Sequence, residues 1–143
     1  MPTFSASISA WVKKSRQRID AVARGSAQDV ARGVTKPVAK GGHMRVDTGF
    51  LRASFMASTS SMPQINPYAR PPSDAPEGSY SPSEDDVSLV IAGWDAGREV
   101  LFLGFTASYA IPREYEDGFV RLEVQKWQET VNRNASKAIR AFP

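Results

Sequence analysis

The sequence predicts an α+β fold in which a small, mainly antiparallel sheet is flanked by a long N-terminal helix and a C-terminal helix. Apolar residues recur every three or four positions near both ends of the chain, short apolar runs typical of strands lie between them, and a long Pro-rich loop separates these runs. The length of 143 residues, with 41% hydrophobic and 23% charged residues, indicates a single soluble globular domain over 1–143. No segment approaches the roughly 20 apolar residues of a membrane span, so we expect no membrane partner.

The first predicted element is an amphipathic helix over 5–35. Its apolar residues recur at helical spacing from Ile8 to Val34, although serines thin the stripe. A glycine inside a helix costs about 1 kcal/mol relative to alanine, so we expect a bend near Gly25 or an end near Gly33. A helix of this length has more surface than a small domain covers, and we expect part of it to pack on another subunit.

The segment 46–54, with the sequence VDTGFLRAS, predicts a corner between this helix and a strand. The side chains of Asp47 and Thr48 can bond their own backbone, and Gly49 adopts a positive φ at little cost. Alternating large and small residues follow the glycine. We therefore expect a strand over 50–59.

Residues 60–83 form a segment with six prolines, here called the Pro-rich arm. The prolines exclude a helix or a central strand. Two interpretations stay open: an arm that orders against a neighbouring subunit with Tyr68 and Tyr80 as anchors, or a mobile linker.

Two apolar runs then predict a strand hairpin over 86–105, with its turn at Asp95-Ala96-Gly97. A second corner, TASYAIPREYE over 106–116, joins a strand to a helix. The last predicted element is an amphipathic helix over 118–141, whose apolar stripe we expect to cover one face of the sheet.

The formal net charge of +3 is unevenly distributed. Residues 1–45 carry nine Lys or Arg against two Asp, a net +7, and the rest of the chain carries −4. This asymmetry suits head-to-tail packing of like subunits or contact with a polyanion, whereas a solvated helix face is the simpler explanation for any single basic residue.

No catalytic or cofactor site is apparent, and we expect neither an enzyme nor a bound cofactor or metal. The single histidine, His43, lies beside a Gly-Gly pair, and no glycine-rich segment has phosphate-loop spacing. Acidic clusters at 84–86 and 114–117 stand at the starts of predicted elements, where capping and solvation explain them better than a hard cation does.

The long first helix and the two corners together resemble the neck or tail-completion (head–tail joining) proteins of long-tailed bacteriophages and phage-like particles. The first corner contributes Asp47, Thr48, Gly49, Leu51, Arg52 and Ser54 to this resemblance. The second contributes Gly104, Tyr109, Ala110, Glu114, Tyr115 and Gly118. The Pro-rich arm and Asp117 depart from the family pattern.

The resemblance implies a structural virion protein that forms a homo-oligomeric ring in the neck, between the DNA-filled head and the tail. Its implied partners are further copies of itself, the portal, adaptor or head-completion proteins, and the tail-terminator or tail-tube proteins. DNA would pass without sequence-specific contact, and assembly would occur in the host cytoplasm. Two alternatives are a tail-terminator ring that caps the tail tube and, with less support, a basic DNA-binding module that uses residues of the first helix.

The interface candidates are charged or aromatic residues of the first helix, the Pro-rich arm and the corners. They are Trp11, Lys13, Lys14, Arg16, Arg18, Arg52, Tyr68, Tyr80, Arg113, Glu114 and Glu116. The arginines near the corners can donate to the carboxylates there, within or between subunits. Trp11 also lies on the apolar stripe, where core packing is the ordinary role.

Overall fold

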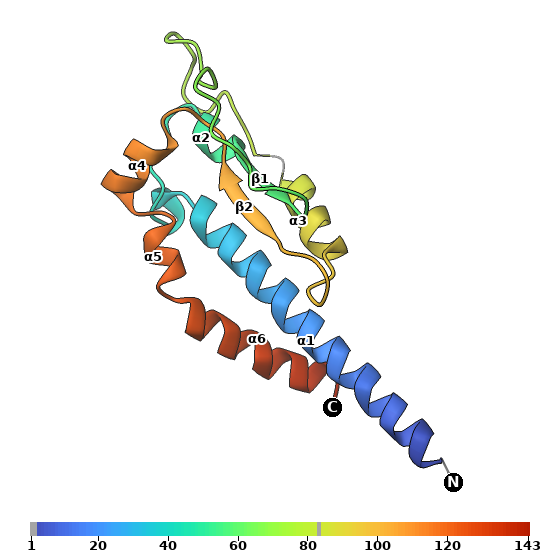
Figure 1. Cartoon of the computed structure of the whole chain (residues 1–143). Helices are drawn as coiled ribbons and strands as arrows, with labels where there is room; N and C mark the ends of the chain where they lie inside the picture. The colour runs from blue at the N-terminus through green and yellow to red at the C-terminus, as the bar shows by residue number, and fades with distance from the viewer. Residues whose placement is uncertain (1–2, 83) are drawn as a thin grey trace.

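The computed structural model describes residues 3–82 and 84–143. The long helix α1 (Phe4–Thr35) lies at its centre, with the helix α6 (Trp127–Ala141) antiparallel along one side (Figure 1). A small sheet and the helix α3 (Glu84–Gly93) lie on the other side. The predicted α+β class is therefore confirmed.

The sheet consists of two antiparallel strands that are far apart in the sequence. They are β1 (Phe55–Ser58) and β2 (Phe102–Phe105). Phe55 pairs with Phe105 across the ladder, and the centroids of their rings lie 4.8 Å apart. This pair connects the end of the first corner to the start of the second.

The helix α1 is uninterrupted over its 32 residues, close to the predicted 5–35. Of the two alternatives predicted for its glycines, the bend near Gly25 is wrong, and the end near Gly33 is confirmed, because α1 ends at Thr35 and the N–H of Lys36 donates to the carbonyl of Gly33. A Cβ at Gly25 would overlap the side-chain amide of Asn134, and a Cβ at Gly33 would overlap the carboxylate of Glu123. The two glycines therefore allow the C-terminal helices to approach α1 closely, and packing outweighs their low helix propensity.

The first corner contains a turn of helix where a strand was predicted. A short 3-10 helix, η1 (Val38–Lys40), lies before the corner. The helix α2 (Phe50–Ala53) lies within it and precedes β1, so the strand predicted over 50–59 is wrong in its first half. The helical turn places Leu51 in the core. An alternating pattern this short does not distinguish a strand from one turn of helix.

The hairpin predicted over 86–105 is also wrong, because its first strand is the helix α3. Val87 and Ile91 lie one helical turn apart and pack against Ala27 and Ala31 of α1. A short apolar run fits a buried strand and a buried helix equally well, so the packing against α1 decides. Ser83 and the side chains of Glu84 and Asp85 lie outside the described part of the chain.

Two helices replace the single helix predicted over 118–141. They are α5 (Arg121–Val124) and α6 (Trp127–Ala141), and the helix α4 (Ala110–Asp117) precedes them. Gly118, at φ 68°, ends α4 with its N–H donating to the carbonyl of Glu114 at 2.8 Å. The helix α6 covers α1, which corrects the expectation that it covers a face of the sheet.

The buried residues form two clusters that share α1. The larger cluster joins α1 to both corners and β2, and consists of Val34, Met44, Leu51, Phe105, Ala107, Ala110 and Phe119. The smaller cluster joins α1 to α3 and consists of Ala27, Ala31 and Ile91. Of the helices in the described ranges, none combines the length and apolarity needed to cross a membrane.

Candidate assembly interface

The two corners of the chain meet in the folded molecule. The rings of Phe50 and Tyr109 stack with their centroids 6.3 Å apart, and Tyr80 meets Phe50 edge-on at 5.1 Å. Burial raises the pKa of the Tyr109 phenol, and hydrogen bonding to the backbone of Leu51 and the side chain of Thr48 offsets only part of this rise. Residues that carry the family resemblance at the two corners therefore belong to one structural unit.

The Pro-rich arm is bonded to the first corner through its backbone. The N–H of Gly78 donates to the carbonyl of Asp47, and that of Tyr80 donates to the carbonyl of Thr48, both at 2.8 Å. Gly49 lies beneath this contact at φ 87°, and a Cβ there would overlap the carbonyl of Tyr80. The glycine thus meets two requirements at once, a left-handed backbone and a close approach.

The same arm also contacts the second corner. The N–H of Asn66 donates to the carbonyl of Thr106 at 2.9 Å, and that of Ser108 donates to the carbonyl of Ala69 at 2.8 Å. Of the two candidate tyrosines, Tyr80 is an anchor within its own subunit and Tyr68 is exposed.

Arg45 links the corners through ion pairs that the sequence did not reveal. Its Nε lies 2.6 Å from Asp117 Oδ1, and its Nη2 lies 2.6 Å from Glu116 Oε2. Hydrogen bonding to Asp117 and the charge of that carboxylate raise the pKa of Arg45. Asp117, which departs from the family pattern, thus has a structural partner, and Glu116 also lies 3.8 Å from Arg113.

Glu114 and Arg52 both stabilise the fold of their own subunit. The carboxylate of Glu114 accepts hydrogen bonds from the N–H groups of Val120 at 2.8 Å and Arg121 at 3.0 Å, at the start of α5. Arg52 Nε donates to the carbonyl of Thr35 at 2.7 Å, at the end of α1. These contacts favour the internal role that the sequence left open.

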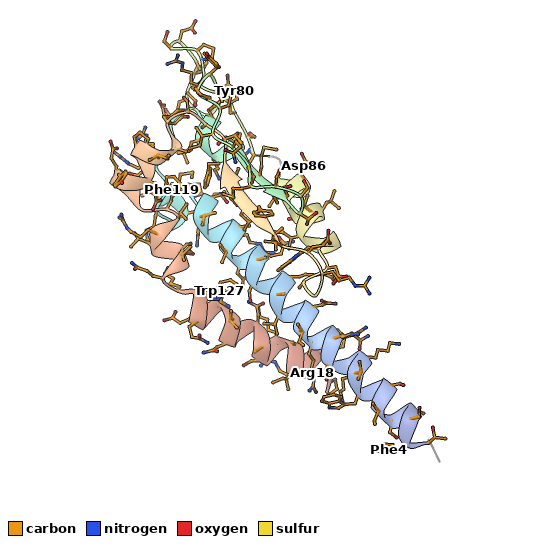
Figure 2. All side chains as sticks on the ribbon, viewed as in Figure 1. Phe4, Arg18, Tyr80, Asp86, Phe119 and Trp127 are labelled. Atoms are coloured by element: carbon orange, nitrogen blue, oxygen red, sulfur yellow. The ribbon has the colours of Figure 1, made fainter. Side chains whose placement is uncertain are left out.

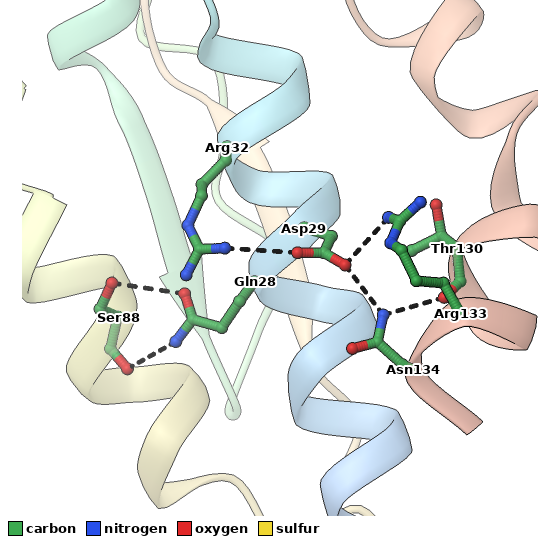
Figure 3. A network of polar contacts seen from close by, with 7 residues as sticks. All are labelled: Gln28, Asp29, Arg32, Ser88, Thr130, Arg133 and Asn134. Carbon is green, nitrogen blue, oxygen red and sulfur yellow. Dashed lines mark hydrogen bonds and ion pairs between the residues drawn. The ribbon is translucent and has the colours of Figure 1, made fainter. Parts of the chain in front are cut away.

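A polar network joins the middle of α1 to α6 (Figure 3). Asp29 Oδ2 accepts hydrogen bonds from Asn134 Nδ2 at 2.9 Å and from Arg133 Nη2 at 3.0 Å. Burial alone would raise the pKa of Asp29, but these hydrogen bonds and the neighbouring cations outweigh it, so the pKa lies below its usual value. On the opposite side of α1, Gln28 bonds to Ser88 of α3.

The N-terminal part of α1 extends past the end of α6 (Figures 1 and 2). Arg18 Nε donates to the carbonyl of Phe142 at 2.7 Å and marks where α6 ends. Residues 4–17 lie beyond this point and are here called the free arm. Trp11, an interface candidate on the free arm, is 68% exposed and therefore does not have the core role that is ordinary on an apolar stripe.

The candidate cations of α1 therefore separate into two groups. Lys13, Lys14 and Arg16 belong to the free arm, and the side chains of Lys13 and Arg16 are exposed. Arg18 instead connects α1 to the C-terminal end of the chain. Its primary contact is within the subunit.

Two apolar grooves lie on the surface, and neither was predicted from the sequence. The helix-pair groove, about 470 Å³ between α1 and α6, is lined by Arg18, Ile19, Val22, Ala23, Ser26, Trp127, Val131, Ala135, Ala138 and Ile139. The sheet groove, about 910 Å³, is lined by residues of α1, β2, α4 and α5 and by 62–65. In the sequence, the available signal for the helix-pair groove was Trp127, a large apolar residue on a helix that a small domain covers on one side only. In the structure its side chain is half-exposed.

No protein-family model, curated protein or solved structure matches the chain. Within the described residues, no group of three or more His, Asp, Glu or Cys side chains is placed to hold a metal ion.

Proposed function

We propose that this chain is a structural subunit of the neck of a long-tailed phage or phage-like particle. In this proposal, copies of the chain form a ring that joins the portal or head-completion complex to the tail. The observation that carries the proposal is the meeting of the two corners. The segments that resemble the neck family are about 60 residues apart in the sequence, yet they share the ring contact between Phe50 and Tyr109.

The surface of the subunit supports the same proposal. The free arm and the two grooves leave large apolar side chains exposed at separate places on the molecule. Contiguous exposed apolar surface is typical of a site that another protein covers. A subunit in a ring needs two different surfaces for its two neighbours, and this chain offers more than one.

Labelling of purified particles tests the proposal. The chain is expressed with a C-terminal tag, because Pro143 is exposed, and tagged particles are examined by immuno-electron microscopy. We expect label at the junction of head and tail. Label on tails that lack heads would favour the tail-terminator alternative, and absence of the chain from purified particles would overturn both.

DNA binding is the second candidate, and the cations of the free arm are the observation that favours it. Replacing Lys13, Lys14 and Arg16 with Gln would then weaken binding and flatten its salt dependence. A matched pair of double substitutions replaces Lys13 and Arg16 in one variant, and Lys36 and Lys40, which are exposed outside the free arm, in the other. Fluorescence anisotropy with duplex DNA at several salt concentrations measures both effects, and unchanged binding after the triple substitution excludes this candidate.

A further inference from the structure

The free arm carries an apolar stripe that its own subunit leaves exposed. Ile8, Val12 and Ser15 follow one another at spacings of four and three, and Ile19 continues the same line into the helix-pair groove. Phe4 and Trp11 flank this line and are among the most exposed large apolar residues of the described chain. The stripe therefore continues along one face of α1 from the exposed free arm into the helix-pair groove.

The helix-pair groove has matching chemistry. Among the described residues that line it, Arg18 at one end is the single charged one. Ile19 and Ile139 on its two walls are 62% and 58% exposed. Such a groove accepts the apolar face of an amphipathic helix.

The free arm and the groove also match in length. Residues 4–17 span about 21 Å of helix, at 1.5 Å per residue. The 15 residues of α6, which form one wall of the groove, span about 22 Å. A second helix the size of the free arm would thus fill the groove from end to end.

The free arm cannot occupy the groove of its own subunit. The helix α1 is continuous from Phe4 to Thr35, so the arm points away from the groove that begins at Arg18 (Figure 2). An arm that reaches the groove must come from another molecule.

We infer that the free arm of one copy of this chain packs in the helix-pair groove of a second copy. The stripe with Ile8 and Val12 then faces Val131 and Ala135 of the other copy. The facing half of a helix of this length measures roughly 350 Å². When two copies exchange arms, each buries one arm face and one groove, roughly 700 Å², close to the ~800 Å² that each partner buries in a standard interface. When copies join head to tail, each partner buries roughly 350 Å² at each contact.

Engineered cysteines test this contact, because the chain contains no cysteine of its own. One preparation carries Ile8→Cys and a second, differently tagged, carries Ala135→Cys. The two are mixed at high protein concentration and oxidised. We expect a disulfide-linked species that contains both tags and disappears on reduction.

The link can form only between copies. Val22 lines the groove with Ala135, and Ile8 precedes Val22 by about 21 Å along the same helix. A disulfide requires Cα atoms within roughly 7 Å of each other. A chain carrying both substitutions gives linked dimers if two copies exchange arms, or a ladder of larger species if copies join head to tail, and both results support the contact.

Two controls identify the contact surface. Lys13→Cys lies about 140° around the helix from Ile8, so it should not link to Ala135→Cys. Tyr115→Cys probes the sheet groove. A link from Ile8→Cys to Tyr115→Cys in place of Ala135→Cys overturns the inference, as does the absence of any link in the first mixture.

A second measurement does not depend on cysteine chemistry. Trp11→Glu places a charge on the free arm where the side chain has no role in the core, so the circular dichroism spectrum should not change. The mass of the protein in light scattering should fall toward that of one chain. An unchanged oligomeric mass contradicts the inference.

The contact does not depend on the proposed role in the neck. Linked copies of a chain that is absent from virions would leave the contact valid and overturn the neck proposal. A chain that is labelled in the neck but never forms the disulfide link would leave the neck proposal valid and overturn the contact.

Discussion

Gly49 is the residue at which the first corner and the Pro-rich arm constrain each other most directly. Its φ of 87° lies in the left-handed region, and its missing side chain leaves room for the carbonyl of Tyr80. An L-residue with a side chain pays about 1–2 kcal/mol for that backbone conformation. The adjacent hydrogen bond from Tyr80 to Thr48 adds a second reason for glycine.

Gly49→Ala is therefore expected to lower the free energy of unfolding by more than the backbone strain of about 1–2 kcal/mol, because the Pro-rich arm must also move away from the new Cβ. Gly78→Ala is the matched control, since Gly78 has a similar φ of 70° but open space around it. Urea denaturation of both variants measures the difference. Equal losses would contradict a close approach at Gly49.

At the scale of elements, the pairing of α1 with α6 determines the shape of the subunit. Gly25 allows the backbone of α1 to approach Asn134, and Asn134 in turn bonds both Asp29 and the carbonyl of Thr130. A single carboxylate thus receives hydrogen bonds across the helix pair. Its protonation removes part of what holds the two helices together.

The lowered pKa of Asp29 predicts an acid-dependent loss of stability. A carboxyl whose pKa is lower in the folded than in the unfolded state stabilises the fold above its unfolded pKa of about 3.9, and this contribution disappears as the pH falls through the folded pKa. At neutral pH, Asp29→Asn should cost about 1–3 kcal/mol, and the difference from the wild type should shrink in acid.

Thermal unfolding between neutral and acidic pH checks this expectation. Asp20→Asn on the same helix is the control, because the described structure records no ion pair for Asp20, and its effect should stay within about 0.5 kcal/mol. A difference between Asp29→Asn and the wild type that does not change with pH would show that the ionised carboxylate is not the stabilising group.

At the scale of the whole molecule, the larger cluster joins the end of α1 to both corners and to β2. Phe119 is 1% exposed, and its ring lies 5.1 Å from that of Phe105. The cluster includes Val34 of α1, Met44 and Leu51 near the first corner, and residues of the second corner. The outer surfaces of the free arm and grooves are then positioned relative to this core.

Phe119→Ala is expected to lower the free energy of unfolding by about 3–5 kcal/mol, since it removes a buried aromatic ring and leaves a cavity. Tyr115→Ala, four residues earlier on an exposed position, should change it by less than about 0.5 kcal/mol in the isolated subunit. Denaturant unfolding, fitted with a common m-value, measures the change in the free energy of unfolding for both variants. Similar losses of stability in the two variants would contradict a core centred on Phe119.

The parts predicted correctly are those that neighbours in the sequence specify. The periodicity from Ile8 to Val34 is long enough to identify α1, and Gly49 at the first corner has the expected positive φ. The acidic residue Glu114 caps a helix start, as its position suggested. The short runs at 50–53 and 86–93 were assigned to strands and are helices, because runs of this length fit both periods.

The sequence by itself thus determined the α+β class, the long first helix, the turn at Gly49 and the large amount of helix surface that the small domain leaves exposed. Only the tertiary structure decided that β1 pairs with β2, that Tyr80 rests over Gly49, that Gly25 receives α6 and that the free arm continues the line of an apolar groove. Helix periodicity and turn chemistry depend on residues a few positions apart, whereas these contacts join residues about 30 to 110 positions apart. Their free energy comes from packing that exists only once the chain has folded.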